Sequence, residues 1–319
     1  MCDDRLSHDK MATPFRESYI RSMESTDKSI GRAVMLIVIS ALSFGSISVL
    51  TVLITSAHVP LLTAMAWRYF VAGVILGIAI RPSSSTPISR RQIVLLMLIG
   101  GFGQAVITYL SLHALEYISV GPLAFLFYTY PAWVALFAAI RRTERLTTLR
   151  MCALALALLG VTIMVGAPRE KLNAVGVMLA LASAILYSVY LPALEQIQRG
   201  APAFISTFFL VAGSAIAFVV ATVIAGELYV PRSGKIWTNI LLLAVVSTVI
   251  AFSALIKGVS VLGPVRTSII ATVEPFFTAI LGAAVLGSTF TRSTLVGGIL
   301  IGAAILIIEL SAGREAAIA

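Results

Sequence analysis

Long runs of apolar, nearly uncharged residues recur along this chain from about residue 34 to residue 310. Each run has roughly 18 to 24 residues, enough for an α-helix to cross about 30 Å of bilayer hydrocarbon. Only 12% of the 319 residues are charged, whereas soluble domains carry about 25% charged residues. The runs therefore predict an all-α membrane protein with ten transmembrane helices, at about 34–56, 61–80, 92–115, 119–140, 149–166, 174–194, 203–226, 239–261, 264–287 and 292–310.

Basic residues are unevenly distributed among the loops that join these spans. The loops after the first and third spans contain no Lys or Arg, whereas seven basic residues follow the second and fourth spans: Arg81, Arg90, Arg91, Arg141, Arg142, Arg145 and Arg150. Because cytoplasmic loops collect Lys and Arg, we expect a multi-pass protein of the cell inner membrane with both termini in the cytoplasm. The second half supports this orientation less clearly, because four basic residues fall in loops expected outside: Arg169, Lys171, Arg232 and Lys235.

The same distribution accounts for the net charge of +9 without nucleic acid as a partner. Residues 1–31 are polar and of mixed charge, and they contain no hydrophobic segment of the kind that a signal peptide needs. We therefore expect flexible cytoplasmic tails at 1–31 and 312–319.

The chain also contains an internal repeat. Segment 114–165 aligns with segment 258–309 at a constant offset of 144, which places Pro131 on Pro275, and the preceding segments align more weakly at an offset of 142. Each copy holds five spans, and the two copies cover 32–166 and 167–311. An odd number of spans inverts the second copy in the membrane, which is the duplication typical of secondary transporters.

Six short motifs occur in order along the two copies: "SFGSIS" and "WRYF" in spans 1 and 2, "YTYPAW" and "ERLT" later in the first copy, and "VEPFF" and "LGSTFT" in the second. This ordered set resembles the drug/metabolite transporter superfamily, EamA type, over about 32–310. The resemblance implies two inverted five-helix repeats around a central cavity, and export or exchange of a small metabolite by alternating access. Two positions depart from the family pattern, since Phe44 replaces the usual Trp and "LGS" replaces "LGE" in the second copy.

Pro131 and Pro275 lie near the middle of spans 4 and 9. A proline lacks the backbone N–H, so it leaves the carbonyl four residues earlier without its helical partner. We therefore predict a kink in each span at the centre of the bilayer, where inverted-repeat transporters bind substrate. A kink that serves only gating, without contact to a ligand, is the alternative interpretation.

Aromatic and polar side chains within the spans supply the other candidate substrate contacts. In span 3, Gln104, Thr108 and Ser111 share one helical face, whereas Tyr109, His113 and Glu116 share an adjacent face. An aromatic ring can stack on a flat solute while its polar group bonds an edge. The aromatic candidates are Tyr109, Tyr128, Tyr130, Trp133, Tyr187 and Tyr190.

Three ionisable residues within spans are further candidates. Arg68 lies eight residues beyond Pro60, or about 12 Å deep at 1.5 Å per residue, so we expect it to face the bundle and hold an acceptor. It is either paired for structural reasons or an attractant for an anionic group. Glu274 beside Pro275, and less strongly His113, are hypotheses for a proton-coupling site, although either side chain can instead bond backbone or a neighbouring helix.

The sequence contains no phosphate-binding Gly loop, no metal-ligand cluster and no nucleophile–base arrangement, so we expect neither an enzyme nor a bound cofactor or metal. The run "GGFGQ" at 100–104 is interpreted as close helix packing. The predicted function is secondary-active export or exchange of a small metabolite, such as an amino acid or related amphipathic compound, with the lipid bilayer as partner and protons as a hypothetical coupling ion. A drug or toxic-compound exporter is the alternative within transport, and a membrane scaffold or sensor is the alternative of another class.

Overall fold

The computed structural model describes residues 6–80, 88–114, 116–118, 120–144, 146–166, 173–287 and 289–318. Within these ranges the chain forms helices and turns and no β-strand. In chain order the helices are α1 (Leu6–Thr55), α2 (Leu61–Ala79), α3 (Arg90–Leu98), η1 (Ile99–Gly103), α4 (Gln104–Ala114), α5 (Val120–Phe127), α6 (Tyr130–Arg141), α7 (Thr148–Val165), α8 (Ala174–Ile197), α9 (Ala203–Ile224), α10 (Gly234–Ala244), η2 (Val245–Ile250), α11 (Ala251–Ala271), α12 (Glu274–Leu286) and α13 (Arg292–Ile318). Four of the basic loop residues considered for the expected orientation lie outside the described residues: Arg81 and Arg145, which support it, and Arg169 and Lys171, which do not.

In the described part of the chain, nine helical stretches are long and apolar enough to cross a membrane. One of them, Gly234–Ala271, has 38 residues and contains a non-helical Gly263 with φ 77° and ψ 166°. Divided at Gly263, this stretch becomes one span that ends there and a second span that continues through the shorter apolar helix α12. The result is ten crossings, so the predicted all-α fold of ten membrane helices in two repeats is confirmed.

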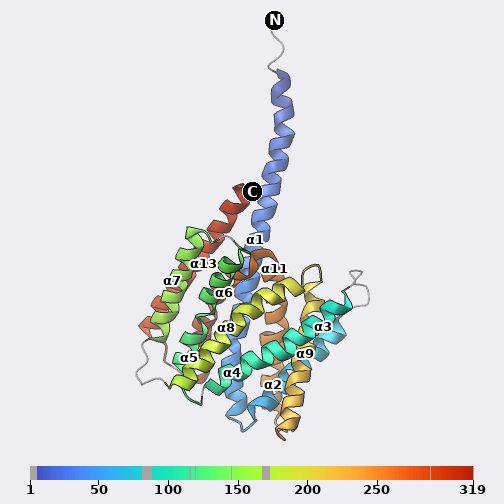
Figure 1. The fold of residues 1–319 in the computed structure, drawn as a ribbon, viewed down its shortest axis with the longest axis vertical. Coiled ribbons are helices and arrows are strands. Elements are labelled where there is room, and N and C mark those ends of the chain that lie inside the picture. The colour runs from blue at the N-terminus through green and yellow to red at the C-terminus, as the bar shows by residue number, and fades with distance from the viewer. Residues whose placement is uncertain are drawn as a thin grey trace.

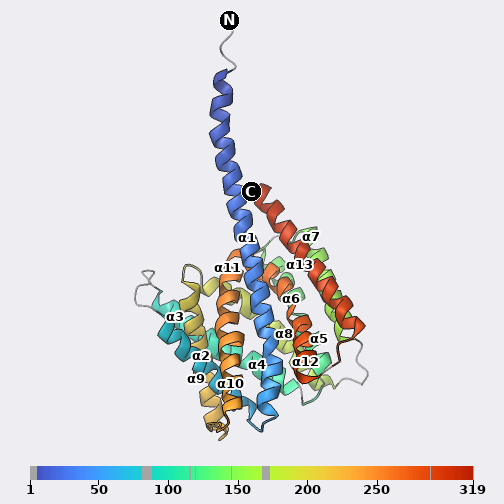
Figure 2. The same cartoon turned by 180° about the vertical axis from the view of Figure 1, so that it is seen from behind.

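The amino-terminal segment is a helix rather than the expected tail. Helix α1 begins at Leu6 and runs without interruption into the first span, and it projects beyond the bundle in Figures 1 and 2. No Gly or Pro occurs between residues 15 and 30, and the helix continues through Gly31 into the span. Helix α13 likewise continues to Ile318, and both termini lie at the same end of the bundle (Figure 1).

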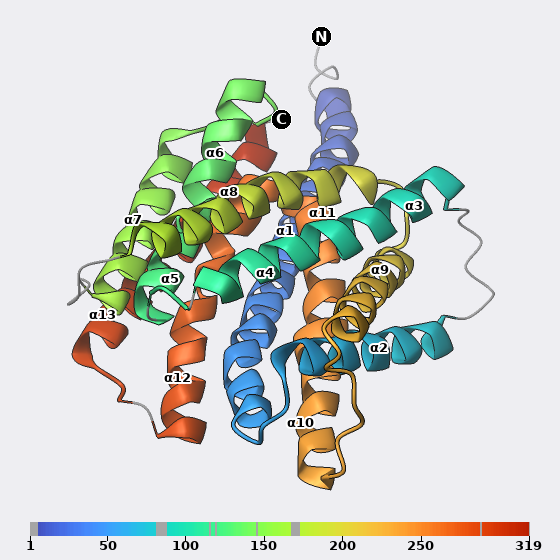
Figure 3. The same cartoon turned by 60° about the horizontal axis from the view of Figure 1, so that its bottom comes forward.

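Equivalent helices of the two repeats pack against each other. Helix α2 packs on its counterpart α9, and α7 packs on its counterpart α13, as Figure 3 shows from the lower end of the bundle. The α7–α13 contact depends on small residues, because a Cβ added to Gly160 would lie 2.7 Å from the carbonyl oxygen of Gly297. Two pairs of equivalent spans, the second and the fifth of each repeat, therefore pack directly across the interface between the repeats.

Spans 4 and 9 are both interrupted at their prolines. Helix α5 ends at Phe127 and α6 begins at Tyr130, and in the second repeat α11 ends at Ala271 and α12 begins at Glu274. Pro131 and Pro275 each lie in the first turn of the new helix, where the missing N–H removes no hydrogen bond. The two predicted kinks are therefore two-residue helix breaks at equivalent places in the repeats.

A second pair of irregularities occurs in spans 3 and 8, which are equivalent in the two repeats. Each contains a π-helical segment, η1 in span 3 and η2 in span 8. In η1, a Cβ added to Gly100 would overlap the carbonyl of Leu210 on α9, and Ser214 Oγ donates to the Gly100 oxygen at 2.9 Å. This is the close helix packing predicted from the "GGFGQ" run. The π-helices were not predicted, and π-bulges are often found at functional sites.

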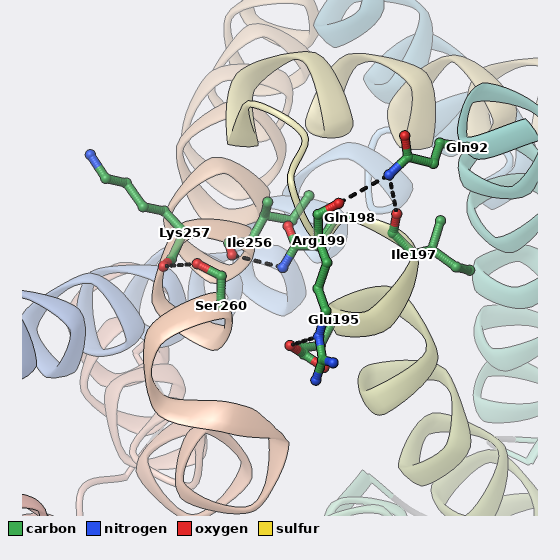
Figure 4. A network of polar contacts seen from close by, with 8 residues as sticks. All are labelled: Gln92, Glu195, Ile197, Gln198, Arg199, Ile256, Lys257 and Ser260. Atoms are coloured by element: carbon green, nitrogen blue, oxygen red, sulfur yellow. Dashed lines mark hydrogen bonds and ion pairs between the residues drawn. The ribbon is translucent and has the colours of Figure 1, made fainter. Parts of the chain in front are cut away.

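The carboxyl-terminal end of α8 is held by amide side chains, as Figure 4 shows. Gln92 Nε2 donates to the carbonyl oxygens of Ile197 and Arg199 at 3.2 and 3.0 Å. Gln198 Nε2 donates to the Ile256 carbonyl oxygen on α11 at 2.9 Å. These bonds connect the end of α8 to α3 and α11, so they fix the position of the helix that carries Tyr187.

Candidate functional site

A cavity of about 290 Å³ lies between the two repeats. Its lining comes from α1, α2, α4, α5 and α6 of the first repeat and from α8, α11 and α12 of the second. Side chains at both helix breaks reach it, including Phe127 and Glu274. The volume is at the lower end of the range for ligand pockets, about 300 to 1,000 Å³, which matches a small solute.

One wall of the cavity is aromatic. Phe127, Tyr128, Tyr130 and Tyr187 all line it. The Tyr130 and Tyr187 rings meet edge to face at 4.8 Å between centroids, and Phe127 lies 5.6 Å from each of them. Rings in such contact fix one another and offer faces and edges to a flat or amphipathic solute.

Glu274 provides the carboxylate of the cavity. It begins α12 and is half-buried, and its carboxyl group interacts with the Tyr128 side chain. Gly45 of the "SFGSIS" motif lies against this turn, because a Cβ there would lie 3.0 Å from the Glu274 carbonyl oxygen. Thr278 Oγ1 makes 3.0 Å contacts with the carbonyl oxygens of both Gly45 and Glu274. The motif therefore allows α1 to approach the break that presents the carboxylate.

Arg68 faces the bundle, as its depth in span 2 predicted. The residue is 3% exposed and lines the cavity. Its Nε donates to Thr248 Oγ1 at 2.7 Å, and its Nη2 donates to the Ser247 carbonyl oxygen at 2.7 Å. The expected acceptors are thus a hydroxyl and a carbonyl of η2. Glu116, which shares a face of span 3 with Tyr109 and His113, lies on the surface.

Four of the predicted contact residues lie outside the cavity lining. Tyr109 is 61% exposed and stacks on His113, which pairs with Glu116 at 3.3 Å. Tyr109 and His113 lie outside the lining because they are on a different face of span 3 from the one that lines the cavity. The cavity face carries Gln104, Thr108 and Ser111.

The other two residues lie behind or beyond the aromatic wall. Tyr190 is buried and stacks on Tyr187 at 5.7 Å between centroids, so it supports the wall from behind. Trp133 packs near Phe137 with ring centroids 6.5 Å apart, about one turn beyond Tyr130 on α6. The predicted contact residues that line the cavity are therefore Arg68, Tyr128, Tyr130, Tyr187 and Glu274.

Sequence reasoning missed the polar residues that hold Arg68. Ser247 and Thr248 are both fully buried in η2, and Ser46 of α1 bonds Ser247 with a 2.7 Å distance between hydroxyl oxygens. The available signal was a Ser-Thr pair in an otherwise apolar span, "LLLAVVSTVIAF". Ser and Thr commonly bond their own helix, so this pair by itself did not indicate a partner in span 2.

A second, charged cleft of about 440 Å³ lies where the turn after α6 meets the bend at Gly263. Glu144 Oε1 accepts a hydrogen bond from the Val265 backbone N–H at 3.3 Å, and Oε2 lies 3.5 Å from Arg150 Nη1. Burial raises the pKa of the Glu144 carboxyl, although the bond from Val265 and the charge of Arg150 act in the opposite direction. The carboxyl group of the "ERLT" motif therefore caps the helix that follows the bend in the other repeat.

Comparison with known proteins agrees with this architecture. The model of the EamA-like transporter family matches residues 31–166 and 174–310, one match for each repeat. One solved structure, described only as a crystal structure of a protein, has a TM-score of 0.71 to this chain and 21% sequence identity, with 88% of this chain and 98% of that chain covered. At that identity the likeness establishes the fold alone. No curated protein matches the chain.

Proposed function

Because this chain belongs to the EamA-like transporter family, we propose that it is a secondary-active transporter that exports or exchanges a small metabolite by alternating access. The observation that carries the proposal is the cavity between the repeats, where an arginine, a carboxylate and an aromatic wall face one small volume. Inverted-repeat transporters place their substrate sites at such a position.

The lining favours an amphipathic solute with charged groups, such as an amino acid. Arg68 supplies a permanent positive charge, and Glu274 supplies a carboxylate in the same cavity. A solute with a carboxylate, an ammonium group and an apolar side chain has a matching group for each of them and for the aromatic wall. Tyr128, Tyr130 and Tyr187 are the proposed stacking and hydrogen-bonding contacts.

Glu274 is also the proposed proton-binding group. Of the described residues that line the cavity, it is the one Asp or Glu, and it begins a helix at a break that is equivalent to one in the other repeat. A carboxyl at bilayer depth is a functional candidate by default. Exchange of a proton there would couple transport to a pH gradient.

Uptake by proteoliposomes tests the proposal. We expect purified protein to accumulate or exchange at least one member of a panel of labelled amino acids, nucleosides and vitamins. Accumulation of lipophilic drugs instead would favour the drug-exporter alternative. Absence of flux for every solute, in protein shown to be folded, would favour a scaffold or sensor.

Cysteine labelling tests the proposed orientation in the inner membrane. In a background of Cys2→Ser and Cys152→Ser, Thr143→Cys in the turn after α6 should resist an impermeant thiol reagent in intact cells. Ala57→Cys, in the turn after α1, should react with it. Both positions are exposed, so modification of the cysteine at 143 together with protection at 57 would reverse the assignment.

A further inference from the structure

We propose that Thr248 is a positioning residue that holds the Arg68 guanidinium ready to bind the carboxylate of the transported solute. The inference rests on the proposed function of the cavity as a substrate site. It is carried by three features of the buried contact between α2 and η2, namely which edge of the guanidinium is occupied, what supports its face, and which charges surround it.

The hydrogen bonds from Arg68 occupy one edge of the guanidinium. Nε donates to Thr248 Oγ1 and Nη2 donates to the Ser247 carbonyl oxygen, both at 2.7 Å. The contact of Nη1 is with the Met65 sulfur at 3.8 Å, a weak acceptor. The end formed by Nη1 and Nη2 thus keeps N–H groups for a further ligand. Two parallel N–H donors in one plane match the two oxygens of a carboxylate.

The face of the guanidinium is also supported. Its central carbon lies 4.8 Å from the centroid of the Tyr69 ring. That ring stacks on Phe218 at 5.3 Å with an angle of 2° between planes. Because a planar cation packs on an aromatic face, the ring restrains the tilt of the guanidinium while η2 restrains its edge. A site that is fixed before the ligand arrives loses less entropy on binding.

Thr248 has a defined role in this arrangement because of its own hydrogen bond. Its Oγ1 donates to the Leu243 carbonyl oxygen at 3.1 Å, five residues earlier. A hydroxyl has one proton, so with that proton used the oxygen must act as an acceptor toward Arg68. The π-helical turn therefore sets Thr248 as an acceptor and directs it toward α2.

The charge around Arg68 is not balanced by its immediate partners. These are a hydroxyl, a backbone carbonyl, a thioether and an aromatic ring, all uncharged. A buried cation is costly unless an anion is close. Because Arg68 lines the cavity, the carboxylate of a solute can provide that anion. The requirement for a counter-charge then favours carboxylated solutes over their neutral analogues.

Ligand pairs that differ only in the carboxylate test the proposal. The binding of benzoate and benzamide, nicotinate and nicotinamide, and phenylalanine and phenylalaninamide would be measured by thermal shift of the purified protein. We expect the parent protein to prefer the carboxylate in at least one pair. Thr248→Val should weaken binding of that carboxylate by about tenfold, the loss expected for one hydrogen bond to a charged group, without weakening the amide.

Two further variants separate positioning from a structural role. Thr248→Ser keeps the acceptor and should retain the preference. Thr207→Val removes a fully buried hydroxyl that bonds only its own helix, from Thr207 Oγ1 to the Ala203 carbonyl oxygen at 2.8 Å, and it should also retain the preference. If Thr248→Val does not fold, Arg68→Lys serves in its place, because it keeps the charge without the planar fork and should lose the preference.

Equal binding of both members of every pair by the parent protein, or no binding of any carboxylate, would overturn the proposal. So would an equal loss of both members in Thr248→Val, because that pattern indicates a structural role. Failure of the proposed function is distinguished by the proteoliposome assay: flux of an uncharged solute together with no carboxylate preference would refute this inference and leave transport in place.

Discussion

In the first repeat, the π-helix η1 presents Gly100 to the carbonyl of Leu210 on α9, whereas in the second repeat η2 presents Thr248 to the guanidinium of Arg68 on α2. The offset of 142 between the repeats makes Arg68 and Leu210 equivalent positions. The same backbone irregularity thus supports close apolar packing on one side and a buried cation on the other. Both repeats contain a π-helix in their third span, and the side chains around it differ between the two repeats.

The helix breaks differ in the same way. Tyr130 precedes Pro131 in the first repeat, and Glu274 precedes Pro275 at the equivalent position of the second. The described residues that line the cavity include two from the set of Lys, Arg, Asp and Glu, namely Arg68 and Glu274. Each repeat therefore contributes one of these two residues, and the equivalent positions hold Leu210 and Tyr130. A symmetric backbone in this way encloses a cavity with one basic and one acidic side chain.

The largest effect is expected where η1 packs most tightly. Gly100→Ala places a methyl group against the Leu210 carbonyl, so η1 and α9 must separate, at a cost of about 3 kcal/mol of unfolding free energy, the upper end of the usual range for overpacking. Gly302→Ala is the matched control, since no described atom beyond the glycine's own helical turn lies within 4 Å of the added carbon. The monodisperse fraction in detergent and its Tm measure the outcome. A Gly100 variant as stable as the Gly302 variant would contradict the packing assigned to η1.

The next effect concerns the cation held by η2. Arg68→Leu leaves the Ser247 carbonyl without a donor, which we expect to cost about 1 to 3 kcal/mol, and it should abolish transport. Arg68→Lys keeps the charge but not the fork, so it should be more stable than the Leu variant and transport poorly. Tm and flux would be measured together. Two variants that match the parent in both assays would show that Arg68 has neither role.

Much of the fold was predictable because the responsible signals are local and repeated. Apolar runs set the spans, and Pro131 and Pro275 set the breaks. The π-helices were not predictable, because one additional residue in a turn leaves an apolar run apolar. The helical amino-terminal segment was also missed, since polar composition alone does not distinguish a tail from a helix that extends beyond a span.

The candidate site was predictable in part. The depth of Arg68 and its position in an apolar span indicated that it faces the bundle, which its 3% exposure confirms. The placement of Tyr109 and Tyr190 depends on how each helix is rotated about its own axis, and a single sequence does not specify that rotation. Thr248 lies 180 residues from Arg68 along the chain, so only the three-dimensional structure brings the two residues together.

A more selective effect is expected at the helix breaks. Glu274→Gln keeps the shape and hydrogen-bonding capacity of the side chain but cannot exchange a proton. It should abolish transport driven by a pH gradient and leave solute counterflow largely intact. Tyr130→Phe, at the equivalent position in the first repeat, should retain the response to the gradient. Parent flux that ignores an imposed gradient, or loss of counterflow and Tm together in Glu274→Gln, would exclude the coupling role.

The smallest effect is expected at the turns between the fourth and fifth spans of the two repeats. The offset of 144 makes Glu144 equivalent to Ser288, which lies outside the described residues. Glu144 caps the helix after Gly263 through the Val265 N–H, and the second copy has no carboxyl at the corresponding place in its sequence. The titration of Glu144 therefore measures the capping of the helix after Gly263 by a carboxyl group that occurs in the first repeat and not at the equivalent position of the second.

Burial raises the pKa of the Glu144 carboxyl above its ordinary value of 4.5. A carboxyl whose pKa is higher in the folded chain than in the unfolded chain binds its proton more tightly in the fold. It therefore stabilises the fold at a pH below its pKa in the unfolded chain. That stabilisation is lost as the pH rises through its pKa in the folded chain. The amide of Glu144→Gln does not titrate in this range. The Tm of the variant minus that of the parent should therefore become more positive from about pH 4 to about pH 7. A difference that stays constant or becomes more negative over this range would mean that the bonds to Val265 and Arg150 outweigh burial, and that the turn stabilises the protein through the ionised carboxylate.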